Sequence, residues 1–241
     1  HIKLIAVPGR LFTHGAPVLT PWMRLQASPI GESACLLGTA DMTPWAVGSE
    51  IFFAPTEFDN PSGAVERRFL TNMTWVNESL CWEIRWEQQG ALSHPHYAGE
   101  FDVTESTVGV KKVALRSVVA MVDRTVNIQS AMSSVDNANQ YGGHIEVFEV
   151  TSTTPMRVGT VSMKYTRFHR LGKGGLSAAF KVGYETNFDP FPVNTLQGNS
   201  WTSSLEYGLH ALASNAPLII TSNVFIQSAD GGIFIDKGSS S

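Results

Sequence analysis

The chain contains few charged residues, and they form no run of one sign. Only 16% of its 241 residues are Asp, Glu, Lys or Arg, and the net charge is -4. This composition excludes the basic surface that binds nucleic-acid phosphates, so we expect no nucleic-acid partner. The apolar runs fall short of the ~18 residues of a membrane helix, so we expect no membrane insertion in this segment.

The N-terminal residues also lack a basic region followed by an apolar one, as a signal peptide would have. The chain begins in strand-like sequence and ends on a Gly-Ser run that resembles a linker. We therefore expect a piece of a longer protein whose targeting signals lie elsewhere.

Cysteine is scarce as well, since Cys35 and Cys81 are the only two. Two cysteines cannot form a disulfide framework; they could make one bridge in a secreted protein or remain two buried thiols, and we favour the bridge. Among seven histidines, only His94 and His96 are closely spaced, and no Cys/His cluster supplies further zinc ligands. We predict no metal site and no cofactor.

Helical periodicity is nearly absent, and alternating β-branched and aromatic runs take its place. Gly, Asn, Asp and Ser separate these runs, which is typical of all-β proteins. The strand-like runs include residues 50–53, 126–129, 144–150, 160–165 and 217–220. Residues 1–112 carry five of the six tryptophans and are irregular, whereas residues 113–241 are periodic. We predict two segments with these bounds in one continuous structural unit.

The periodic segment repeats at fixed intervals. Asn199 and Leu209 recur 24 residues later as Asn223 and Ile233, and Leu196 recurs as Ile220. Thr166, Gly175 and Leu176 stand 33 residues before Asn199, Gly208 and Leu209, and the extra residues fall in a loop-like insertion at 181–194. Such a period indicates a β-solenoid, in which Asn199 and Asn223 form a structural ladder of stacked turn asparagines.

A family resemblance points the same way. Trp22-Met23-Arg24-Leu25 and Trp45-Ala46-Val47-Gly48-Ser49-Glu50-Ile51, with later pieces up to residues 223–238, resemble the domain named for its eight glycines. That domain occurs in fibrocystin-like proteins and in hyaluronidases of the cell-migration-inducing type. The resemblance implies a right-handed parallel β-helix with an irregular β-rich N-terminal segment.

The resemblance argues against catalysis. The hyaluronidase branch carries histidines at positions that hold Ala179, Lys181 and Gly232 here. The chain is therefore more similar to the fibrocystin-like branch, for which the resemblance implies no hydrolase activity. If the chain were an enzyme acting on hyaluronan-like polysaccharide, it would have to use His94, His96, Asp102, Arg116 or His144.

Two further features concern glycans. Trp75, Trp82 and Trp86 could form a stacking platform for sugars, although tryptophans in strands are more often part of a core. Asn72 and Asn77 each begin an N-glycosylation sequon.

We predict a non-catalytic extracellular or cell-surface module of a filament-forming glycoprotein, stiff and able to associate with itself or with neighbouring modules. The alternatives are a secreted polysaccharide hydrolase and a glycan-binding module without turnover, for which an extracellular polysaccharide would be the partner.

Overall fold

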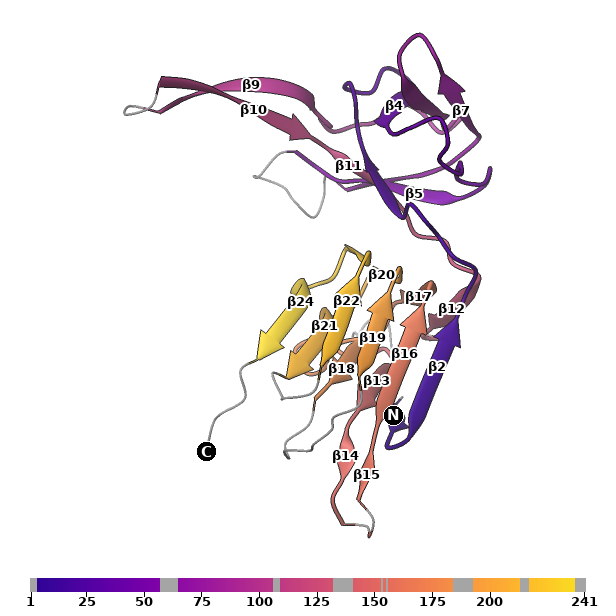
Figure 1. Ribbon diagram of the computed structural model, residues 1–241, viewed down its shortest axis with the longest axis vertical. Helices are drawn as coiled ribbons and strands as arrows, with labels where there is room; N and C mark the ends of the chain where they lie inside the picture. The colour runs from indigo at the N-terminus through magenta and orange to yellow at the C-terminus, as the bar shows by residue number, and fades with distance from the viewer. Residues whose placement is uncertain are drawn as a thin grey trace. The chain divides into compact units, whose positions relative to one another are not determined.

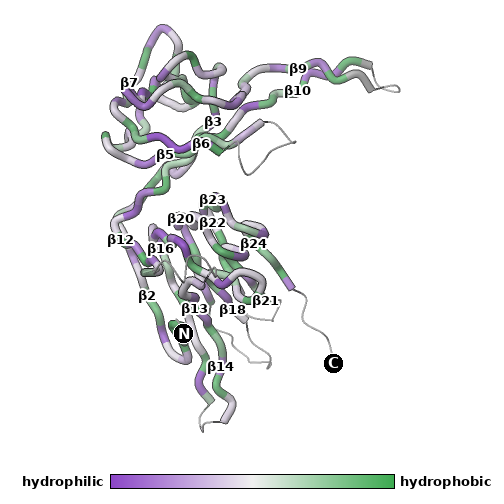
Figure 2. Tube along the Cα trace, turned by 180° about the vertical axis from the view of Figure 1, so that it is seen from behind, coloured by the Kyte–Doolittle hydropathy of each residue, from purple (hydrophilic) through white to green (hydrophobic). Residues whose placement is uncertain are grey.

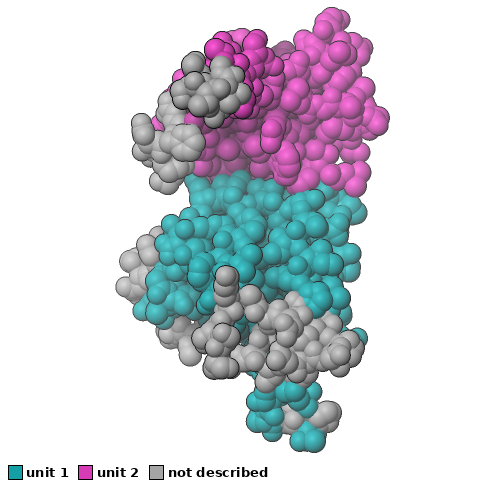
Figure 3. Space-filling model, turned by 60° about the vertical axis from the view of Figure 1, so that its left-hand side comes forward, with its two compact units in different colours: residues 1–18, 124–241 teal, residues 19–123 magenta. Residues whose placement is uncertain are grey.

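The computed structural model describes residues 4–56, 65–105, 109–131, 141–152, 154, 156–183, 193–212 and 217–236. Within these ranges every regular element is a β-strand, so the chain is all-β, as predicted (Figure 1). It forms two compact units: unit 1 comprises residues 1–18 and 124–241, and unit 2 comprises residues 19–123 (Figure 3).

Unit 1 contains three parallel sheets. The first has five strands in the order β1 (Leu4–Val7), β13 (His144–Val147), β18 (Phe180–Val182), β21 (Tyr207–Leu212) and β24 (Gly231–Asp236). The second contains β2 (Arg10–His14), β16 (Thr160–Lys164), β19 (Asn194–Gln197) and β22 (Leu218–Thr221). The third contains β12 (Val126–Gln129), β17 (Thr166–His169), β20 (Ser200–Thr202) and β23 (Val224–Ile226). A short antiparallel hairpin, β14 (Glu149–Val150) and β15 (Arg157–Val158), follows β13.

Unit 2 contains three antiparallel sheets. One has the order β3 (Trp22–Arg24), β11 (Val118–Met121), β5 (Glu50–Phe53) and β6 (Glu66–Phe69). Another has the order β4 (Ser33–Leu37), β8 (Cys81–Arg85) and β7 (Asn72–Val76). The third is a ribbon of β9 (Ala98–Glu105) and β10 (Gly109–Arg116).

These units differ from the division at residue 112 that the sequence suggested. β1 and β2 pair in parallel with β13 and β16, so the first residues of the chain belong with its C-terminal part. β11 pairs antiparallel with β3 and β5, which keeps residues up to Asp123 in unit 2. Unit 2 is thus an insertion into unit 1, between β2 and β12. The amide of Ala16 donates to Thr125 Oγ1 at 2.7 Å, which joins the two ends of the insertion.

The 24-residue repeat corresponds to strand pairing. Leu196 pairs with Ile220, Ser200 with Val224, and Leu209 with Ile233. The 33-residue spacing holds in the third sheet, where Arg167 pairs with Ser200. It fails in the first sheet, because Phe180 rather than Leu176 pairs with Leu209. Leu176 is instead exposed in a turn. Most of the insertion expected at 181–194 lies outside the described residues.

The turns that lead into and out of the strands of the third sheet, which we call corners, have the same backbone conformation in successive repeats. Tyr165, Gly198 and Ser222 precede the strands of the third sheet, and all have φ between 53° and 63°. Arg170, Ser203 and Gln227 follow these strands, each with φ of 55°. A Cβ at residue 198 would lie 2.5 Å from the ring of Tyr165, so glycine is required there for the corners to stack.

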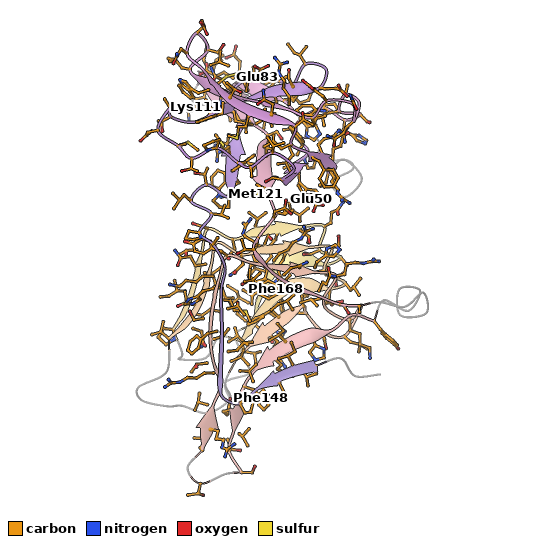
Figure 4. The ribbon with its side chains drawn as sticks, turned by 90° about the vertical axis from the view of Figure 1, so that its right-hand side faces the viewer. Glu50, Glu83, Lys111, Met121, Phe148 and Phe168 are labelled. Atoms are coloured by element: carbon orange, nitrogen blue, oxygen red, sulfur yellow. A yellow bond between two sulfur atoms is a disulfide. The ribbon has the colours of Figure 1, made fainter. Side chains whose placement is uncertain are left out.

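The core of unit 1 is a stack of side chains on successive strands. The rings of Phe168 and Trp201 are 4.8 Å apart, and those of Trp201 and Phe225 are 4.6 Å apart with an interplanar angle of 9°. Figure 4 shows Phe168 among the strands of unit 1, and Figure 2 shows hydrophobic stretches on these strands. Aliphatic side chains such as Met163, Leu196 and Leu209 complete this core.

Candidate functional site

Three groups with perturbed pKa values lie on or beside one sheet of unit 1, the sheet β1-β13-β18-β21-β24. Burial lowers the pKa of His144; the charge of Glu146 raises it, and the charges of Lys181 and Lys173 lower it further. Burial also lowers the pKa of His210 on β21. Glu206, directly before β21, has a raised pKa because of burial and of Asp230. Perturbed pKa values concentrate at functional sites, so this sheet is one candidate site, beside the network of Glu66 in unit 2.

A row of polar and aromatic side chains crosses the outer face of this sheet. Ile145, Phe180 and Leu209 are fully buried and point into the core. Since side chains alternate along a strand, the next residues, at positions 146, 181 and 210, point outward. The strand register aligns these outward residues across the sheet: Ala6, Glu146, Lys181, His210 and Phe234. We call the last four the outer row.

Neighbouring members of the outer row are in contact. Lys181 Nζ lies 3.0 Å from Glu146 Oε1, in an ion pair that joins β13 to β18. The rings of His210 and Phe234 are 5.0 Å apart, and Tyr207 stacks on Phe234 at 4.9 Å. His210 Nε2 is buried and has no hydrogen-bond partner among the described residues. The outer row therefore presents a carboxylate that accepts hydrogen bonds, an ammonium group that donates them, an imidazole and a phenyl ring.

A hollow of about 320 Å³ adjoins the outer row at the C-terminal ends of the strands. Glu146 and Lys181 form part of its wall, and the other lining residues are Leu4, Val147, Phe148, Glu149, Thr151, Gly183 and Leu212. Phe148 lies where the chain enters the β14–β15 hairpin (Figure 4). The hollow thus extends the row beyond the strands.

Glu206 and Asp230 form a carboxyl pair on successive repeats. Asp230 raises the pKa of Glu206 both by a hydrogen bond and by its charge, and the Gly175 amide donates to Glu206 Oε2 at 2.5 Å. This pair was not predicted from the sequence, although Glu206 and Asp230 are 24 residues apart and the 24-residue period relates them. A direct hydrogen bond is closer than the ~5 Å separation of the carboxyl groups in retaining glycosidases. The pair therefore lacks the geometry of that reaction.

His96 is buried in unit 2, in a network that fixes a loop. Its Nδ1 donates to the carbonyl of Ala54 at 2.8 Å, and its Nε2 lies 3.1 Å from Glu66 Oε2. Burial raises the pKa of Glu66, but hydrogen bonds from the amides of Ser93 and His94 and from His96, with the Arg68 charge, outweigh it and leave the pKa lowered. The ionised carboxylate accepts from both amides, so Glu66 and His96 hold residues 93–96 against β6.

The residues expected for a hydrolase lie on several different elements. His94 and His96 both line a hollow of about 230 Å³ with Pro95 and Tyr97, and His96 is also held by hydrogen bonds to Ala54 and Glu66. Asp102 lies on the β9–β10 ribbon opposite Lys112. Arg116 donates to the carbonyls of Leu25 and Gln26 at 3.2 and 2.6 Å. His144 belongs to unit 1. Of the positions at which the hyaluronidases that the sequence resembles carry histidine, Ala179 is fully buried and Lys181 is in the outer row.

The tryptophan platform is not formed. Trp86 is fully buried and donates through Nε1 to the carbonyl of Gly90 at 2.9 Å. Trp82 is 6% exposed and donates to the carbonyl of Thr39 at 3.0 Å. Only Trp75 is partly exposed; it packs edge-on against Trp82 at 5.7 Å. These rings are core and edge cover, because their faces are occupied by protein.

The two cysteines form a disulfide. Cys35 on β4 and Cys81 on β8 are joined with their Cα atoms 5.7 Å apart. The strands pair in the register Cys35 with Glu83 and Leu37 with Cys81, so the bridge connects β4 to β8 diagonally.

Both sequon asparagines are exposed on the adjacent edge of the same sheet. Asn72 begins the edge strand β7, and Asn72 Oδ1 accepts from Thr74 Oγ1 at 3.2 Å. Asn77 follows β7 in an exposed turn and accepts from Trp75 Nε1 at 2.8 Å.

In the described part of the chain, no group of three or more His, Cys, Asp or Glu side chains could hold a metal ion. None of the described segments is a helix long and apolar enough to cross a membrane. No protein-family model, curated protein or solved structure matches the chain.

Proposed function

We propose that the chain is a non-catalytic structural module of an extracellular or cell-surface glycoprotein, built on a right-handed parallel β-helix. The observation that carries the proposal is the order in which the chain visits the three parallel sheets of unit 1. β16, β17 and β18 occupy the second, third and first sheets; β19 to β21 and β22 to β24 repeat this order. Right-handed crossovers are almost universal between parallel strands of one sheet. The resemblance to the fibrocystin-like branch agrees with this proposal.

Self-association is the proposed means of assembly. Among the described residues, β22, β23 and β24 each have one edge without a partner strand, as do β1, β2 and β12. Core positions of β24 are partly exposed, because no strand among the described residues pairs with its outer edge: Ile233 is 43% exposed and Ile235 is 63% exposed. Unpaired edges and uncovered apolar positions favour the addition of another chain.

The test is electron microscopy and analytical ultracentrifugation of the purified chain over a range of concentrations. We expect ordered filaments or concentration-dependent oligomers, and we expect Ile235→Lys to abolish them without unfolding the protein, because residue 235 is already exposed. Leu176→Lys is the matched control, since Leu176 is 68% exposed in a turn. A monomer at every concentration, or equal assembly of both variants, would contradict the proposal.

The disulfide and the two exposed sequons support an extracellular location, because disulfides persist in oxidising compartments. After secretion from a eukaryotic cell, we expect enzymatic removal of N-glycans to lower the mass of the protein. Thr74→Ala destroys the first sequon, whereas Thr74→Ser preserves it. The glycan at Asn72 should therefore be lost only from Thr74→Ala. A protein without glycans on either asparagine would refute this part of the proposal.

A further inference from the structure

We propose that N-glycans on Asn72 and Asn77 protect the free edge of β7 and so prevent this strand from pairing with a second copy of the chain. This role rests on the proposed glycoprotein, since it requires both asparagines to be glycosylated. It concerns an edge in unit 2, whereas the proposed assembly uses strands of unit 1.

β7 forms an open edge of its sheet. On one side it pairs antiparallel with β8, and among the described residues no strand pairs with its other side. The opposite edge of the sheet, formed by β4, is partly covered: Leu36 bridges to Leu25, and the amide of Gln26 donates to the carbonyl of Cys35 at 2.8 Å. β7 therefore presents a row of backbone donors and acceptors to which another strand can add.

The sequence of β7 lacks the usual means of protecting an edge. Natural edge strands carry charged residues, above all lysine, or a proline or bulge that blocks the addition of a strand. The five residues of β7, Asn-Met-Thr-Trp-Val, include no charge and no proline, and they pair with β8 in unbroken register. Met73, Trp75 and Val76 are partly exposed. A short uncharged strand of this kind favours association with copies of itself.

The two sequons lie at the two ends of this edge. Asn72 is the first residue of β7 and Asn77 directly follows the last, so about 17 Å of extended strand separates them. Asn72 Oδ1 accepts from Thr74 Oγ1, and Asn77 Oδ1 accepts from Trp75 Nε1. In the described part of the chain, the two side-chain nitrogens have no hydrogen-bond partner, and these are the atoms that carry N-glycans. A bulky glycan at each end would lie beside the open edge and exclude an incoming strand.

Residue 74 separates protection of the edge from loss of the glycan. Thr74 is exposed at the middle of β7 and belongs to the first sequon. It pairs with Glu83 of β8, which an ammonium group at residue 74 would face across the strands. Thr74→Lys therefore removes the glycan from Asn72 but puts a charge on the edge, whereas Thr74→Ala removes the glycan alone.

The experiment compares three proteins secreted from a eukaryotic cell, each of which carries Ile235→Lys to prevent association through β24. The first retains both sequons, the second also carries Thr74→Ala and Ser79→Ala, and the third carries Thr74→Lys and Ser79→Ala. Analytical ultracentrifugation measures association, hydrogen exchange with mass spectrometry measures the protection of β7 peptides, and thermal unfolding checks that each protein is folded. We expect the second protein to dimerise at a concentration at least about tenfold lower than the first or the third, with slower amide exchange in β7.

The possible failures can be told apart. A first protein without glycans on either asparagine would contradict both the proposed glycoprotein and this role. Glycans on the first protein, together with no increase of association in the second, would overturn the protective role alone. Equal association of the second and third proteins would show that the lost glycans rather than the open edge cause it, which would also overturn the proposal. None of these outcomes bears on assembly through β24, which is tested with the glycosylated chain.

Discussion

The backbone amide of Asn199 donates a hydrogen bond of 2.8 Å to Asn223 Oδ1, which stands at the same corner one repeat later. Asn199 Oδ1 in turn accepts from the amide of Thr166 at 2.9 Å, so the asparagines connect three successive corners. Each also donates through its side-chain amide to a carbonyl, that of Met163 or Leu196. The ladder predicted from the repeat is therefore present, and it satisfies backbone groups that the corners would otherwise leave unpaired.

The ladder gives the first prediction. Asn199→Ala removes two hydrogen bonds from a fully buried side chain and leaves the Thr166 amide and the Met163 carbonyl without partners. We expect a loss of about 2–4 kcal/mol in the free energy of unfolding, because each buried unsatisfied group costs about 1–3 kcal/mol. Urea denaturation measures this change in the free energy of unfolding. Asn127→Ala, on the exposed side of β12, should change stability by no more than about 0.5 kcal/mol. Similar losses in both variants would contradict a special role for the ladder.

The stack of Phe168, Trp201 and Phe225 gives the second prediction. Trp201 lies between Phe168 and Phe225, and its Nε1 is buried without a hydrogen-bond partner among the described residues. Trp201→Phe keeps a ring in the stack and removes the unsatisfied donor, so we expect a change within about 1 kcal/mol. Trp201→Ala should cost about 3–5 kcal/mol because it leaves a cavity. Thermal unfolding of the two variants checks the difference; a Phe variant as unstable as the Ala variant would show that the indole itself is needed.

The carboxyl pair gives the third, which concerns pH. The pKa of Glu206 is raised in the folded state, so folding favours its protonated form. Stability should therefore increase as the pH falls through the folded pKa of Glu206, and it should be lower above that pKa, where Glu206 and Asp230 repel each other. Glu206→Gln should remove this part of the pH dependence and raise the melting temperature at neutral pH. Melting curves at pH 5 and pH 8 make the comparison, with Glu83→Gln in unit 2 as a control. A variant less stable than the wild type at pH 8 would disprove the repulsion.

The disulfide gives the fourth prediction, which concerns the stability of unit 2. Cys35 and Cys81 are 46 residues apart, and closing a loop of that length stabilises the folded state by about 4 kcal/mol in the chain-entropy model. We expect a Cys35→Ala, Cys81→Ala double variant to lose about 2–4 kcal/mol in unit 2. Hydrogen exchange followed by mass spectrometry should show faster exchange in peptides of β4 and β8. Peptides of β17 and β20 in unit 1 serve as the internal control, and equal acceleration there would mean that the bridge stabilises both units.

The sequence by itself determined the all-β class, the 24-residue repeat and the positions of the ladder asparagines. These features depend on local periodicity and turn chemistry. The 24-residue spacing between Leu196 and Ile220, for example, equals the offset at which their strands pair. The exposure of the sequons at Asn72 and Asn77 also follows from a local feature, the polar edge and turn in which they lie.

Only the tertiary structure decided which segments belong together. β2 pairs with β16 although about 150 residues separate them, and no local pattern indicates that unit 2 interrupts the first repeat. The burial of Trp82 and Trp86 and the alignment of Lys181 with His210 likewise depend on long-range pairing. Strand register determines which side chains become neighbours, and in a parallel sheet that register is fixed by packing between distant segments.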